Sequence, residues 1–116
     1  MDAWPSELRV SEDKRHLTIS FDDGASFAHS AEYLRVVSPS AEVQGHSPEQ
    51  RQTVPGKKDV EIMKLDPIGN YAVRITFTDL HDTGIFTWRY LREIGEEYEA
   101  RWGQYLQELE EKGLSR

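Results

Sequence analysis

The sequence predicts an α+β domain that consists of a small, meandering antiparallel β-sheet, a short helix after the third strand and a longer C-terminal amphipathic helix. Two patterns carry this prediction. Apolar and polar residues alternate in short runs up to residue 87, which is typical of half-buried strands. From Trp88 onward the apolar residues recur at intervals of three and four positions, which is typical of one face of a helix.

Three strands and a short helix are predicted in the first part of the chain. The runs ELRVS and HLTISF are joined by DKR, and Leu17, Ile19 and Phe21 share one face of the second run. The Asp-Gly step of DDG, placed before the run ASFAHS, is typical of a tight hairpin. The segment SAEYLRVV then predicts a helix that Ser30 caps and that ends at its two valines.

A second group of strands is expected after a long loop. Residues 38–57 contain three prolines and two glycines without a sustained period, which predicts an ordered loop of the kind that is often functional. The run DVEIMKL ends at the turn PIGN, and the turn TDLHDTG precedes a returning strand, IFTW. Between these turns lies the clearest strand pattern, formed by Tyr71, Val73, Ile75 and Phe77.

The predicted C-terminal helix begins around Trp88 and carries a long apolar seam. Its members are Leu91, Ile94, Tyr98, Trp102, Tyr105 and Leu109. Because a small sheet can cover only the first half of such a seam, we expect Trp102, Tyr105 and Leu109 to stay partly exposed and to pack against a second copy or a partner protein. The alternative, in which the helix folds back over the sheet, stays open.

Composition restricts the class of protein. A chain of 116 residues favours one domain, 1–116. The net charge of −7 argues against binding to nucleic acid or to anionic lipid. The absence of cysteine excludes disulfides and thiolate ligands, and no apolar run approaches the ~20 residues of a membrane span. The start of the sequence resembles no export signal, so a cytoplasmic protein is expected. No cofactor is expected, because the sequence contains neither cysteine nor a nucleotide-binding motif.

The candidate chemical residues are mostly serines and histidines. Ser38 and Ser40 flank a proline without a GxSxG elbow, so we interpret them as turn formers. The histidines form neither an HxH nor an HExxH pattern, and those at positions 16 and 29 are expected on the surface. His46 and His81, the second of which precedes Asp82, are better placed in loops to contact a ligand.

Arg51, Lys57 and Lys58 form a small basic cluster in this acidic chain. It could bind a phosphate or the carboxylates of a partner, although a solvated loop explains it equally well. The predicted binding surface therefore consists of Ser38, Ser40, His46, Arg51, Lys57, Lys58, His81 and Asp82.

Four segments together resemble a known family. They are LRVVSPSAEVQGH, VPGKKDVEI, IGNYAVRITFTDLHDTGIFTW and YLREIG. In this order they are similar to the small bacterial family named for the N-terminal domain of gamma-butyrobetaine hydroxylase. The resemblance covers about residues 7–95 and leaves 96–116 as a helical extension. It implies a small α+β domain with antiparallel strands and a few helices.

The resemblance also bears on the loop that begins at Ser38. In the hydroxylase this loop carries a Cys-x-Cys-x-x-Cys arrangement that binds structural zinc together with a later histidine. The matching positions here are Ser38, Ser40, Val43 and His81. Because hydroxyl and isopropyl groups cannot replace thiolates on zinc, the resemblance implies that the metal site is lost.

The resemblance leads to two hypotheses about function. The catalytic jelly roll of the hydroxylase is a separate domain, and similar N-terminal domains are attached to ATP-dependent iron–sulfur cluster carriers. The resemblance therefore implies a non-catalytic interaction module linked to oxygenase or iron–sulfur enzymes. The alternative is a metal-binding protein or small enzyme that uses His46, His81 and Asp82.

Overall fold

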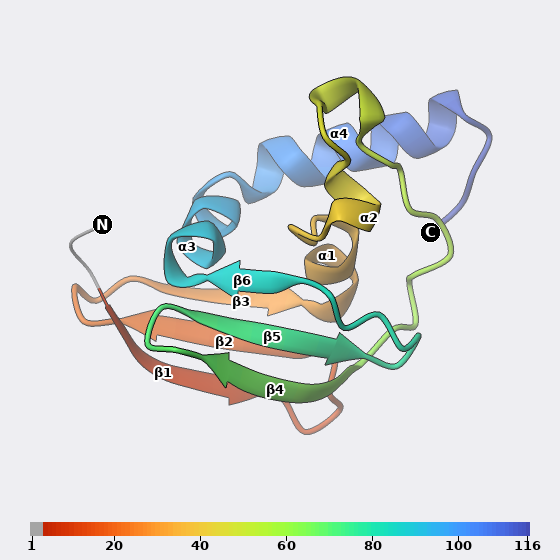
Figure 1. Cartoon of the computed structure of the whole chain (residues 1–116). Helices are drawn as coiled ribbons and strands as arrows, with labels where there is room; N and C mark the ends of the chain where they lie inside the picture. The colour runs from red at the N-terminus through yellow and green to blue at the C-terminus, as the bar shows by residue number, and fades with distance from the viewer. Residues whose placement is uncertain (1–3) are drawn as a thin grey trace.

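The computed structural model describes residues 4–116 and confirms the α+β fold class (Figure 1). The strands form two three-stranded antiparallel sheets rather than a single one, in the orders β1-β2-β3 and β4-β5-β6. The elements are β1 (Pro5–Val10), β2 (His16–Phe21), β3 (Ser26–Ser30), α1 (Ala31–Val36), α2 (Ala41–Gln44), the 3-10 helix η1 (Pro48–Gln50), β4 (Ile62–Ile68), β5 (Ala72–Phe77), β6 (Ile85–Thr87), α3 (Trp88–Glu96) and α4 (Tyr98–Glu111).

The predicted turns and caps are confirmed in the first sheet. Strands β2 and β3 pair from His16↔Ser30 to Ser20↔Ser26, and Gly24 takes the positive φ of 91° that the turn between them requires. The Ser30 hydroxyl accepts the backbone N–H of Tyr33 at 3.0 Å and so caps α1. In the long loop after α1, the chain forms the two short helices α2 and η1.

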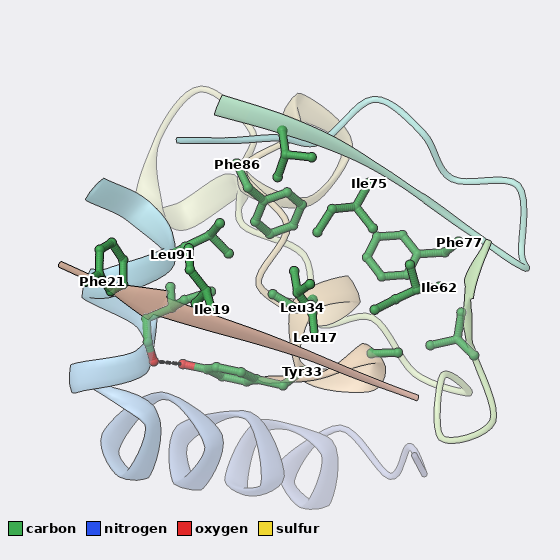
Figure 2. Packing of buried hydrophobic residues seen from close by; sticks show 14 residues of the cluster. Leu17, Ile19, Phe21, Tyr33, Leu34, Ile62, Ile75, Phe77, Phe86 and Leu91 are labelled. Atoms are coloured by element: carbon green, nitrogen blue, oxygen red, sulfur yellow. Dashed lines mark hydrogen bonds between the residues drawn. The ribbon is translucent and has the colours of Figure 1, made fainter. Parts of the chain in front are cut away.

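The hydrophobic core lies between the two sheets and the helices (Figure 2). Leu17 and Ile19, which share one face of β2 as the alternating pattern predicted, pack in this core with Ile75 and Phe77 of β5. Helices α1 and α3 cover the same core, to which they contribute Tyr33, Leu34, Leu91 and Ile94. Each of these side chains is fully buried.

The C-terminal segment is two helices rather than the continuous one that the seam predicted. Glu97 leaves the helical conformation, with φ −102° and ψ 17°, and Figure 1 shows α3 and α4 pointing in different directions. A physical reason lies next to this break, where the Tyr33 hydroxyl donates to the carbonyl of Ile94 at 2.6 Å (dashed line in Figure 2). A tertiary hydrogen bond thus takes a carbonyl of the last turn of α3.

The break lets α4 fold back over the rest of the chain. Tyr105 and Leu109 are only 4% exposed and form a second apolar cluster with Val36. Trp102, which is half-buried, packs against both clusters. The expectation that the far half of the seam is uncovered is therefore wrong for Tyr105 and Leu109, which other parts of the same chain cover. Their exposure no longer supports a partner interface at this helix.

Candidate functional site

The structure brings Ser38, Ser40 and His81 together at the end of α1. The turn between β5 and β6 carries His81 to the start of the long loop, where its Nε2 lies 3.2 Å from Ser38 Oγ. Ser38 Oγ also donates to Ser40 Oγ at 3.2 Å and accepts the backbone N–H of Ser40 at 3.3 Å. Val43, in α2, is buried as well. The resemblance matches four positions to zinc ligands. Three of them, Ser38, Ser40 and His81, are thus connected by hydrogen bonds through Ser38 Oγ.

Both serines lie inside the protein. Ser38 is 0% and Ser40 4% exposed, so the expectation that they contribute to a binding surface is wrong. Burial also argues against a nucleophilic role for Ser38, because its hydroxyl is enclosed and its proton is already donated to Ser40. Close packing by Gly84 completes the enclosure, since a Cβ at that position would lie 2.4 Å from Ser38 Oγ.

A compact ionic network surrounds Asp79, two residues before His81. Oδ2 of Asp79 lies 2.8 Å from Arg35 Nε and 2.7 Å from Lys57 Nζ. Its Oδ1 accepts the backbone N–H of His81 at 3.1 Å. Burial raises the pKa of Asp79, but the bonds from Lys57, the His81 N–H and Arg35 together outweigh burial and hold the pKa at about 2.

The imidazole of His81 is half-buried beside this network. Burial lowers the pKa of His81, and the positive charge of Arg35 lowers it further, against the opposing effects of Asp79, Glu42 and Asp82. A lowered pKa favours a neutral imidazole at neutral pH. Nε2 of the neutral ring can form one hydrogen bond with the Ser38 hydroxyl. The arrangement is therefore suited to fixing the loop against the turn.

An open depression in the surface lies next to this network. We call it the His81 face, and its lining residues are Arg35, Glu42, Lys57, Asp79, Leu80, His81, Asp82 and Thr83. Thr83 Oγ1 lies 3.0 and 2.9 Å from the two carboxylate oxygens of Glu42, which ties the turn to α2. Leu80 has a positive φ of 69° and is 73% exposed, so the lining includes an exposed apolar residue in a strained backbone conformation.

The remaining predicted residues are dispersed. His46 and Lys58 are exposed, and neither lines the His81 face. Arg51 forms an ion pair with Glu108 of α4 and lines a different hollow. His29 was expected on the surface and is instead buried, with Nε2 3.0 Å from the carbonyl of Leu91.

A metal site that uses His46, His81 and Asp82 finds no support in this geometry. Within residues 4–116, no three His, Cys, Asp or Glu side chains are grouped so that they could hold a metal ion. The two hydroxyls and the isopropyl group at the other matched positions are unsuitable ligands for zinc. The residues present therefore do not fit a zinc site of the thiolate type.

Sequence reasoning missed five residues of the His81 face, namely Arg35, Glu42, Asp79, Leu80 and Thr83. One of them carried a local signal, because an aspartate two residues before a turn position often accepts its backbone N–H, as Asp79 does for His81. The ion pair between Arg35 and Asp79 joins residues 44 positions apart and has no local signal.

This α+β domain, with its serine–histidine cluster, matches a family model described as gamma-butyrobetaine hydroxylase-like, N-terminal, over residues 8–92. The chain therefore belongs to that family. Helix α4 lies beyond the matched residues. None of the curated proteins matches the sequence.

Solved structures share the fold. One solution NMR structure has a TM-score of 0.83 at 40% sequence identity, and the match covers 98% of this chain and 90% of that one. A second has a TM-score of 0.84 at 41% identity, with coverages of 98% and 85%. A crystal structure of a protein of unknown function from Acidithiobacillus ferrooxidans ATCC 23270, which belongs to the DUF971 family, has a TM-score of 0.66 at 37% identity, with coverages of 78% and 91%.

The similarity to solved structures extends beyond the residues that the family model matches. Because the two NMR structures match 98% of the chain, the likeness includes most of α4.

Within residues 4–116, no helix combines the length and apolar character that crossing a membrane requires.

Proposed function

We propose that this protein is a non-catalytic accessory domain that docks a partner protein through the His81 face and keeps its fold without zinc. The observation that carries the proposal is the hydrogen-bonded contact of buried Ser38 with His81 at 3.2 Å. It joins the loop to the turn with neutral side chains, as a metal would join them with thiolates. The family resemblance points to oxygenase or iron–sulfur enzymes as the class of partner.

Three features of the His81 face support a docking role. Leu80 is an exposed apolar side chain among charged lining residues, and apolar contacts with a polar rim are typical of surfaces where proteins bind one another. The charged groups Arg35, Lys57 and Asp79 bind one another, which leaves them poorly placed to act on a substrate. Strain at Leu80 adds to the case, because strained residues concentrate at functional sites.

Metal independence is tested by chelation. We expect the melting temperature of the purified protein to be the same with and without EDTA, and elemental analysis to find far less than one zinc per chain. A fall of many degrees on chelation would contradict the proposal, because structural zinc contributes folding free energy directly.

Docking is tested with two matched substitutions of exposed leucines. Leu80→Asn removes the exposed apolar side chain, and asparagine tolerates the positive φ at this position. Leu106→Gln removes a leucine that is 39% exposed on α4. We expect a partner captured by the wild type to be captured by Leu106→Gln and lost with Leu80→Asn. Equal capture by both variants would show that the His81 face is not the docking surface.

A further inference from the structure

A second hollow lies on a different part of the molecule, where α4 meets the loop. It has a volume of about 70 Å³, and its lining comes from the end of α1, from α2, from the residue after η1 and from α4. The lining residues are Val36, Val37, Gln44, Arg51, Arg101, Gln104 and Tyr105. None of them belongs to the His81 face, so a ligand bound in this hollow would leave the proposed docking surface unoccupied.

The lining of this hollow contains arginines, and each of them is paired with glutamate outside the lining. The chain has a net charge of −7, yet the lining contains two arginines and no acidic residue. Next to the lining, the carboxylate of Glu108 accepts from Arg51 and from Gln104. Arg101 is held from outside by Glu97, at 2.9 Å from Nε, and its guanidinium lies 5.7 Å from the centre of the Tyr90 ring.

Donor groups remain free for a ligand. A guanidinium carries five N–H donors. The hydrogen bonds described above use one from Arg51 and one from Arg101, and a second nitrogen of Arg101, Nη2, lies 3.8 Å from the Glu93 carboxylate. Both side chains line the hollow and are 31% and 29% exposed, so each guanidinium is partly open to solvent. Carboxylates are the natural acceptors for such groups, because two parallel N–H bonds match their geometry.

The floor of the hollow is apolar. Val36 and Tyr105 are buried members of the second cluster, and Val37 packs against them. The Tyr105 hydroxyl is already bonded to the carbonyl of Val54 at 2.6 Å, so the ring presents carbon atoms. Pockets that combine an apolar floor with a few placed polar groups are typical small-molecule sites.

We propose that this hollow, the α4 crevice, binds a short-chain organic carboxylate. Arg51 and Arg101 bond the carboxylate at the mouth, while Val36, Val37 and Tyr105 contact the hydrocarbon chain. The volume limits the ligand to a few non-hydrogen atoms, because one water molecule takes up about 30 Å³ of liquid. Binding here also joins α4 to the loop, since both supply an arginine.

The proposal is tested by NMR titration of the whole protein with sodium propionate at constant ionic strength. We expect saturable shifts of the backbone amides around Val37, Gln44 and Arg101. The uncharged analogue 1-propanol and inorganic phosphate are the two comparison ligands. Equal shifts from propanol would overturn the role of the arginines, and equal shifts from phosphate would overturn the role of the apolar floor.

Variants locate the site. Gln104→Glu adds a carboxylate to the lining, so we expect propionate to bind at least about tenfold more weakly. Because Gln104 donates to Glu108, the melting temperature of this variant is measured alongside to confirm that it is folded. Arg101→Gln should weaken binding to a similar degree. Arg89→Gln is the matched control, because Arg89 is exposed on α3 outside the crevice. Wild-type affinity in Gln104→Glu would overturn the proposal.

Discussion

His29 is the residue whose environment most clearly predicts a measurable effect of pH. Its ring is 3% exposed and stacks on Phe27 with 6.2 Å between ring centres. Burial lowers the pKa of His29 from 6.5 to about 4, against the opposing effect of the bond to the Leu91 carbonyl. Between pH 6.5 and about pH 4 the unfolded chain therefore binds a proton that the folded chain does not.

We accordingly expect the free energy of unfolding to fall as the pH decreases from 6.5 towards 4, with His29 contributing on the order of 3 kcal/mol. Urea unfolding at a series of pH values measures this loss. His29→Gln keeps a donor for Leu91 but does not titrate, so its stability should depend less on pH in this range. An identical pH dependence in the variant would contradict the assignment.

His81 and His46 make a matched pair at the same scale. His81→Ala removes the partner of buried Ser38 Oγ, so we expect the free energy of unfolding to drop by about 1 kcal/mol. His46 is exposed, and its bond to Gln50 is made by the backbone, so His46→Ala should stay within about 0.5 kcal/mol. Denaturant titration of both variants gives the comparison, and equal effects would contradict the role given to His81.

At the scale of elements, two glycines in the C-terminal helices should respond oppositely to the same substitution. Around Gly103 of α4 nothing lies within 4 Å of an added Cβ, so Gly103→Ala should raise the free energy of unfolding by about 0.5–1 kcal/mol through helix propensity. At Gly95 of α3 the added Cβ would lie 2.6 Å from Phe27 Cδ1. Gly95→Ala should therefore destabilise the protein by about 1 kcal/mol.

Thermal unfolding of the two variants side by side tests this pair. Stabilisation by both substitutions would show that Phe27 moves aside easily, and that α3 does not depend on close contact with β3. Destabilisation by both would show that α4 is not an independently favourable helix at Gly103.

At the scale of the whole molecule, the course of α4 determines what a truncation of its seam does. Leu109 is buried against Val36 within the chain, so Leu109→Ala should lower the free energy of unfolding by about 2–4 kcal/mol. Leu106→Gln, on the exposed side of the same helix, should change it by less than about 0.5 kcal/mol. Both melting temperatures should be independent of protein concentration. A melting temperature that rises with concentration in the wild type, but not in Leu109→Ala, would instead place the seam in an interface between copies.

Local patterns in the sequence were sufficient to predict most elements. The alternation around Ile75, the Asp-Gly hairpin and the cap at Ser30 each depend on a few neighbouring residues, so they could be recognised before the fold was known. The division of the strands into two sheets could not be predicted in this way, because it depends on which distant strands bury the same core. The break at Glu97 is hidden for the same reason, since a hydroxyl from α1 bonds the carbonyl of Ile94.

The candidate site, like the fold, was predicted from the sequence only in part. The sequence alone marked His81 and Asp82 as turn residues and singled out the loop at Ser38. Only the tertiary structure decided that Ser38 is buried beside His81, that Arg35 and Lys57 share one oxygen of Asp79, and that Arg51 belongs to a crevice under α4. The physical reason is that burial and ion pairing arise from contacts between residues far apart in the chain, whereas turn chemistry and helical or strand periodicity are properties of neighbours.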